Sequence, residues 1–243
     1  MNGFAALYVA QVSRARAARV PLLFVATLQS VGILLLLRGV VDETTDTTSQ
    51  QVVAGATILV VAFVALNLLA QRFGSLRASG ALDHYATLPV AGSTVVLATA
   101  ASYATFTVPG AVLTAVVGSL LYGLSMAHLW VLVAVLPLAG AGLAGMGAAL
   151  GLLAPRAELA TVAGQLGMSA VLFVGIIPAG RLPEVLRGAR AIVPSTYAVD
   201  ALAASYRPQL DSGLLVRDLG VCVAVAVLAL GLASAAFRRA VRA

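Results

Sequence analysis

Long apolar runs separated by short polar stretches dominate the pattern of this chain. A helix that crosses a bilayer needs about 20 predominantly apolar residues. In each run the apolar residues lie on every side of a helix, rather than alternating with polar residues as in a membrane β-strand. The pattern therefore predicts an all-α, polytopic membrane protein with six transmembrane helices, at residues 20–37, 52–70, 95–121, 129–153, 159–177 and 219–237.

The stretch before the first span, residues 1–19, is amphipathic over two turns. Phe4, Leu7, Tyr8 and Val12 recur at helical spacing. This spacing favours a helix that lies on the cytoplasmic membrane surface. A plain cytoplasmic extension of the first span is the alternative.

Two connections, residues 71–94 and 178–218, are longer than a turn requires. The first predicts a short polar helix around residues 75–86, stopped by Pro89. The second contains two apolar runs, 184–193 and 197–206, that are too short to cross a bilayer. They predict two short helices that re-enter the outer leaflet, with an ordinary surface loop as the alternative.

The composition supports the same class of protein. Hydrophobic residues make up 61% of the chain and charged residues only 10%, against about 25% in a typical soluble domain. We therefore expect one transmembrane domain over residues 1–243. All 15 basic residues are arginine, which excludes a Walker-A ATPase site and a serine–lysine catalytic pair. With one cysteine and two histidines, neither a disulfide framework nor a zinc cluster is expected.

The arginines are unevenly distributed between the two sides of the membrane. With the N-terminus inside, the inner segments carry nine arginines and two acids, whereas the outer segments carry six arginines and seven acids. Cytoplasmic segments of membrane proteins are enriched in positive charge. We therefore expect both termini to be cytoplasmic, and we attribute the net charge of +6 to membrane orientation rather than to a nucleic-acid partner.

No set of residues suits catalysis within the membrane. His84 and His128 fall in connections, and no aspartate or glutamate lies in the middle of a span. An intramembrane serine protease needs a histidine at the depth of its nucleophile, and proton-coupled carriers usually need a membrane-embedded ionisable group. We expect a chain that is not an enzyme and binds no metal or cofactor itself, and that forms a path driven by another component.

A few polar and small residues interrupt the spans. Asn67 lies in the second span, and Gln165 and Ser169 lie one turn apart in the fifth. Buried amides must find a partner in lipid, so these residues are candidates for interhelical packing or for a transport path. Gly147 and Gly151 have the spacing of a close helix contact, within one subunit or at a dimer seam.

The first long connection carries a sequence resemblance. The run Gly80-Ala-Leu-Asp-His-Tyr-Ala-Thr-Leu-Pro89-Val resembles the segment between spans two and three in permeases of ATP-binding cassette (ABC) exporters of the type-2 class. The six spans, the inside termini and a short helix late in the outer half match that family as well.

The second long connection agrees with the resemblance. In that family, phenylalanine or isoleucine followed by proline precedes a Leu-Pro pair and then an Asn-Pro-x-x-Tyr run. Val193 and Ala203 depart from this pattern, because the family commonly has asparagine and arginine there. The matching positions of this outer re-entrant segment are Pro178, Pro183, Pro194, Tyr197 and Asp200. For Asp200, the residues themselves allow a helix-stabilising contact or an arginine pair instead of contact with cargo.

The resemblance implies a transport complex. Such permeases form dimers, and a separate ATPase subunit binds ATP and Mg²⁺ and contacts the helix between spans two and three. The re-entrant helices then lie over the exit. The implied ATPase-contact residues are Arg77, Gly80, Asp83, His84, Tyr85, Leu88 and Pro89. Anchoring to anionic lipid headgroups is the alternative for Arg77.

The predicted function is the permease subunit of an ATP-driven exporter. Its apolar bundle suits a hydrophobic or amphipathic cargo such as a drug, a lipid or a lipid-linked glycan. A chain rich in alanine, arginine and glycine but without lysine indicates a GC-rich bacterial genome, and hence a bacterial plasma membrane. A self-sufficient secondary transporter or channel, not driven by ATP, is the alternative.

Overall fold

The computed structural model describes residues 3–40, 46–82, 85, 87, 90–176 and 195–241. This part of the chain is mostly helical and contains no strand. The helices are α1 (Gly3–Val40), α2 (Asp46–Val61), the π-helix η1 (Ala62–Leu68), α3 (Leu69–Ala78), α5 (Gly92–Tyr122), the short 3₁₀-helix η2 (Leu129–Val131), α6 (Leu132–Leu153), α7 (Ala157–Ile176), α9 (Ser195–Ala204) and α10 (Ser212–Ala240).

Within these residues, four helical stretches are long and apolar enough to cross a membrane. They are Thr47–Ala78, Gly92–Tyr122, Leu129–Leu153 and Ser212–Ala240. Two further helices contribute shorter apolar stretches, Leu23–Arg38 of α1 and Ala157–Phe173 of α7. The all-α, multi-pass prediction is therefore confirmed, whereas crossing by all six helices stays a prediction.

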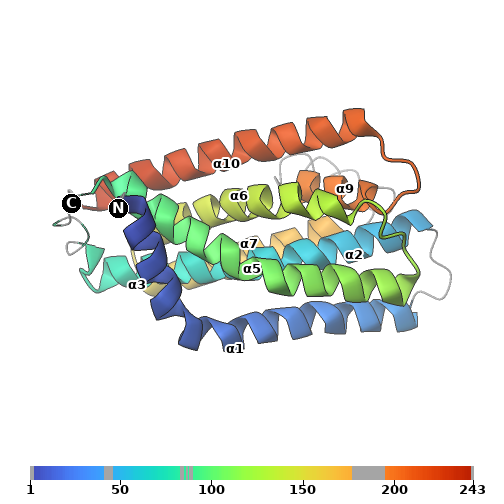
Figure 1. The fold of residues 1–243 in the computed structure, drawn as a ribbon. Helices are drawn as coiled ribbons and strands as arrows, with labels where there is room; N and C mark the ends of the chain where they lie inside the picture. Colours follow the sequence, from blue (N-terminus) through green and yellow to red (C-terminus); the bar gives the residue numbers. More distant parts are fainter. Residues whose placement is uncertain are drawn as a thin grey trace.

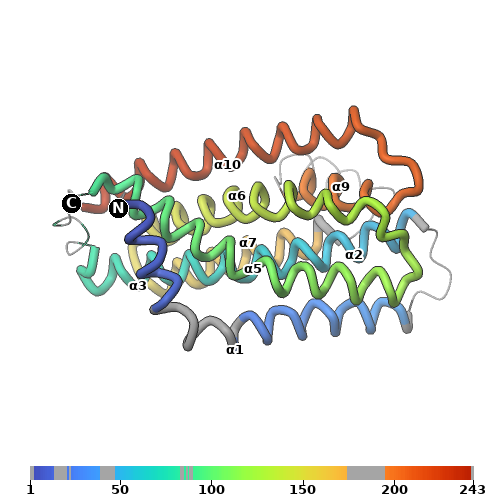
Figure 2. The backbone as a smooth tube through the Cα atoms, in the orientation of Figure 1, coloured from blue at the N-terminus to red at the C-terminus, as the bar shows by residue number. Residues whose placement is uncertain are grey.

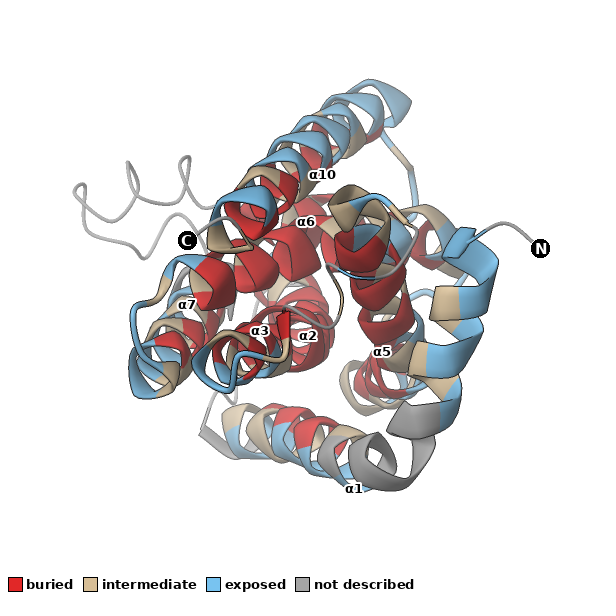
Figure 3. Cartoon of the chain, turned by 90° about the vertical axis from the view of Figure 1, so that its left-hand side faces the viewer, coloured by how far each residue is buried: buried red, intermediate tan, exposed pale blue. Residues whose placement is uncertain are grey.

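The long helices form a bundle around a central helical run made by α2, η1 and α3. Both chain termini lie at one end of the bundle, and α9 lies at the other (Figure 1). Viewed from the end with the termini, the buried residues gather on α2, α3 and α6, and the exposed ones on the outer sides of α1, α7 and α10 (Figure 3). Of the most apolar window of the central run, 89% is buried.

Glycines on the neighbouring helices allow this close packing. A Cβ added at Gly147 of α6 would collide with the carbonyl oxygen of Leu66, and one at Gly151 with that of Ala70. Gly145, by contrast, faces the backbone of α10 at Ala229. Small residues let helices approach when lipid supplies no hydrophobic drive for association. The glycines of the fourth predicted span thus serve packing within one chain.

The amphipathic stretch predicted at the N-terminus forms the first part of α1. Its first part, Gly3–Ser13, lies at an angle to the rest of α1 and packs beside α5 (Figure 2). The hydroxyls of Tyr8 and Thr105 are 3.0 Å apart, and the rings of Phe4 and Tyr8 stack. Gly3–Ser13 is thus helical, and the placement of this helix on the membrane surface stays a prediction.

Candidate functional site

The connection between α3 and α5 begins with a glycine turn. Gly80 has a φ of +68°, a conformation that glycine adopts without steric cost. The amide of Ser79 donates to the Ser75 carbonyl and that of Gly80 to the Arg77 carbonyl, which closes the last turn of α3. The prediction of one helix around residues 75–86 is therefore wrong. Its first turn is the end of α3, and the left-handed residue separates it from Leu82 and Tyr85.

Of the predicted ATPase-contact residues, Arg77, Gly80 and Tyr85 are described. Arg77 is half-buried and donates through Nη1 to the carbonyls of Leu152 (2.6 Å) and Ala154 (3.0 Å). These carbonyls end α6 and have no partner within that helix, so Arg77 caps α6. Gly80 is exposed at the turn. Asp83, His84, Leu88 and Pro89 lie outside the described residues.

Tyr85 links this connection to the N-terminal helix. Its hydroxyl accepts a hydrogen bond of 3.4 Å from Nε2 of Gln11. Nearby, a Cβ added at Gly3 would lie 2.8 Å from Cγ1 of Val90. The first turns of α1 therefore contact the predicted coupling segment at two points, and sequence reasoning gave no sign of this contact.

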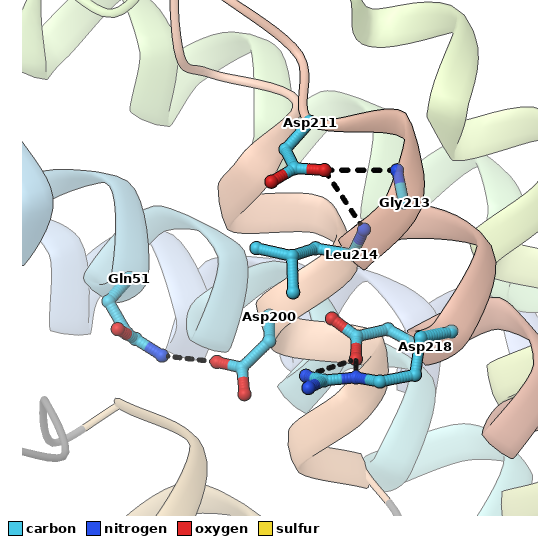
Figure 4. A network of polar contacts seen from close by, with 7 residues as sticks. Gln51, Asp200, Asp211, Gly213, Leu214 and Asp218 are labelled. Carbon is cyan, nitrogen blue, oxygen red and sulfur yellow. Dashed lines mark hydrogen bonds and ion pairs between the residues drawn. The ribbon is translucent and has the colours of Figure 1, made fainter.

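At the opposite end, α9 is inserted among the long helices and is largely buried. Asp200 is half-buried and accepts a hydrogen bond of 2.7 Å from Nε2 of Gln51 on α2 (Figure 4). Tyr197 is half-buried on the same helix. Of the other residues predicted in the outer segment, Pro178, Pro183 and Pro194 lie outside the described residues. The structure thus pairs Asp200 with an amide of the central run.

The start of α10 completes the polar cluster at this end. Asp211 caps the helix by accepting from the amides of Gly213 (3.0 Å) and Leu214 (3.1 Å), as Figure 4 shows. Asp218 is buried and forms an ion pair of 2.9 Å with Arg217, whose guanidinium is largely exposed. Tyr197 and Asp200 also act electrostatically on the guanidinium of Arg217. The cluster joins α2, α9 and α10.

Tyr206, just after α9, reaches between the long helices. Its hydroxyl faces those of Thr57 on α2 and Ser119 on α5, but it makes no aligned hydrogen bond within the described structure. Thr57 and Ser119 donate instead to backbone carbonyls of their own helices. Burial raises the pKa of Tyr206 to about 12, although the two facing hydroxyls lower it.

The middle of the central run is the π-helix η1. π-Helices are rare in proteins as a whole, but those that occur are often found at functional sites. Asn67 lies in η1, is buried, and accepts a hydrogen bond of 3.1 Å from Gln71. A Cβ at Gly164 of α7 would lie 2.8 Å from Oδ1 of Asn67. The structure therefore gives Asn67 a packing and hydrogen-bonding environment on the inside of the bundle.

Gln165 and Ser169 of α7 are less buried than Asn67. Gln165 is exposed and Ser169 is half-buried. A second exposed amide, Gln29, interrupts the apolar face of α1 and was missed by sequence reasoning. Its signal was available, because it is the single amide within the first predicted span.

No group of three or more histidine, cysteine or acidic residues could hold a metal ion in the part of the chain that the structure describes. No curated protein sequence matches this chain. The sequence model of the ABC-2 type transporter family, however, matches residues 4–206. This match extends from the first turn of α1 to Tyr206 and includes the connection after α3 as well as α9. The chain belongs to the ABC-2 type transporter family, as a membrane permease component.

Proposed function

We propose that this chain is the permease subunit of an ATP-driven exporter, with six spans, both termini in the cytoplasm and a separate ATPase subunit. The family match supports a permease, and the lack of lysine leaves no Walker-A residue for ATP. A bundle without mid-span carboxylates suits a hydrophobic or amphipathic cargo.

One observation carries the proposal for coupling. A single buried helical run, α2–η1–α3, connects the polar cluster at Gln51 with the turn at Gly80. Packed helices move as rigid bodies, so a push on the connection after α3 tilts the whole run. This motion reaches Asp200 on α9 through its bond to Gln51.

The exposed amides support a dimer whose path lies along α1 and α7. Gln29 lies about 14 Å along its helix from Arg38, and Gln165 about 17 Å from Ile176, so both are at mid-depth if those ends lie near one membrane surface. An amide facing hydrocarbon lacks hydrogen-bond partners, which is costly. Contact with a second copy, or with a polar part of the cargo, satisfies them.

The test is reconstitution with an ABC ATPase subunit from the same genome. In proteoliposomes, the permease is expected to stimulate ATP hydrolysis, and transport is expected to require ATP. The triple variant Asp83→Arg, His84→Ala and Tyr85→Ala should insert into the membrane normally but should lose the stimulation of ATP hydrolysis. Arg207→Asp, a charge reversal at the exposed outer end, is the matched control and should retain it.

Two results decide against the proposal. Unchanged stimulation in the triple variant removes the contact site at residues 80–85. Transport that persists without ATP and collapses with an ion gradient supports the alternative, a secondary transporter.

A further inference from the structure

The side of the bundle that carries the N-terminal helix contains an apolar groove of about 360 Å³. It lies between α5, α6 and α10, all of which are long and apolar enough to span a membrane. Small side chains on α5 and α6 create the hollow. The groove is lined by Phe4, Leu97, Ala101, Thr105, Ala141 and Leu230, among others.

The groove is partly covered by α1. Phe4 contributes to its wall, and the stacked ring of Tyr8 is held by the contact between its hydroxyl and that of Thr105. The uncovered part of the groove opens to the outside of the bundle, since Leu97 and Val108 are both partly exposed. An apolar chain lying along the bundle can fill this space without desolvating polar groups.

Two arginines lie further along α10 than the groove, toward the end of the bundle that carries the chain termini. Arg238 and Arg239 form the last turn of α10 and are exposed. Leu230, which lines the groove, is eight residues before Arg238, about 12 Å away along the same helix. Arginines next to a span attract anionic headgroups in that leaflet. The groove and the two cations therefore match the two parts of one molecule, an acyl chain and an anionic headgroup.

We propose that this groove binds an anionic phospholipid from the leaflet next to the chain termini, with one acyl chain beneath Phe4 and the headgroup at Arg238 and Arg239. The bound lipid contacts the same α1 segment that contacts the connection after α3 through Gln11 and Tyr85. Lipid occupancy and the position of that connection are thereby linked. This site is separate from the path proposed along α1 and α7, and it does not depend on an ATPase.

The test is photolabelling of the full chain in phosphatidylcholine vesicles that contain a minor fraction of phosphatidylglycerol with a diazirine in its acyl chain. Mass spectrometry then locates the label. Peptides containing Phe4 and residues 97–108 are expected to be the main labelled sites. A second apolar groove of about 440 Å³ lies between α1 and α5 and includes Leu113. Labelling of this second groove serves as the reference for ordinary lipid contact.

Three variants sharpen this test. Ala101→Trp fills the groove and should abolish its label, whereas Leu113→Trp, the same kind of change in the comparison groove on the same helix, should not. Arg238→Gln with Arg239→Gln leaves the groove intact and should reduce the preference for phosphatidylglycerol over a matched phosphatidylcholine probe roughly tenfold. Equal labelling of the two grooves overturns the proposal, and so does a headgroup preference that survives loss of both arginines.

Discussion

The central run α2–η1–α3 and the peripheral helix α10 are nearly equal in length and in mean hydropathy, yet they occupy opposite environments. Of their most apolar windows, 89% is buried in the central run and 33% in α10. Leu59 of α2 is 2% exposed, whereas Leu228 of α10 is 68% exposed. Hydropathy thus determines that both helices enter a membrane, but it does not determine which one the protein surrounds.

The difference comes from what faces each helix. Glycines of α6 and α7 lie directly against the central run, at Leu66, Asn67 and Ala70. On α10, by contrast, a Cβ added at Gly220 or Gly231 would meet nothing within 4 Å among the residues that the structure describes. Because lipid tails are as apolar as leucine, close packing rather than hydrophobicity selects the buried helix.

The largest contrast is expected from equal truncations in the two helices. Leu59→Ala leaves a cavity among packed helices and should lower the free energy of unfolding by about 2–5 kcal/mol. Leu228→Ala should change it by about 0.5 kcal/mol or less, because lipid or detergent refills the space. Thermal unfolding of both variants in the same detergent measures the difference, and equal losses would contradict the assigned environments.

A smaller contrast is expected from adding a methyl group to a glycine. Gly147→Ala forces a Cβ against the Leu66 carbonyl and should cost about 1–3 kcal/mol, since neither backbone can give way freely. Gly231→Ala on α10 meets open space and should be neutral or stabilising by about 1 kcal/mol, as alanine favours a helix. A neutral Gly147→Ala would show that α6 does not set the position of η1.

The attachment of the outer segment to the central run should be sensitive to alkali. The pKa of Tyr206 is raised from 10.0 to about 12 in the folded chain. The contribution of the neutral Tyr206 to the free energy of unfolding is therefore complete below pH 10 and is lost as the pH rises toward 12. The loss is on the order of 2 kcal/mol. Unfolding of the wild-type chain followed between pH 9 and 12 should show this loss, and Tyr206→Phe should remove it. The same slope in both proteins would assign the titration elsewhere.

The smallest effect is expected at the end of the central run. Arg77→Gln removes the bonds to the carbonyls of Leu152 and Ala154 and should cost about 1 kcal/mol, because the guanidinium is only half-buried. Arg72→Gln, an exposed arginine on the same helix, should leave stability unchanged. If Arg77→Gln alters only ATPase stimulation and not stability, Arg77 serves the partner rather than α6.

Several features were predictable because they depend on local sequence. Apolar runs of sufficient length predicted the long helices, and Phe4 and Tyr8 at helical spacing predicted the N-terminal helix. The helix expected around residues 75–86 was wrong, because the pattern alone did not reveal that Gly80 adopts a left-handed conformation. The roles of Arg77 and Asp200 were not predictable, because their partners lie 75 and 149 residues away in the sequence.

The amino-acid sequence by itself determined that this protein is a helical, multi-pass membrane component without a lysine for phosphate binding. Its local composition is sufficient for that, since the bilayer selects each helix by its own apolar length. Only the tertiary structure decided that α2–η1–α3 is central, that α10 is peripheral and that Phe4 covers a groove. These features depend on the shapes of facing helices, and the free energy of such contacts belongs to pairs of surfaces rather than to any one segment.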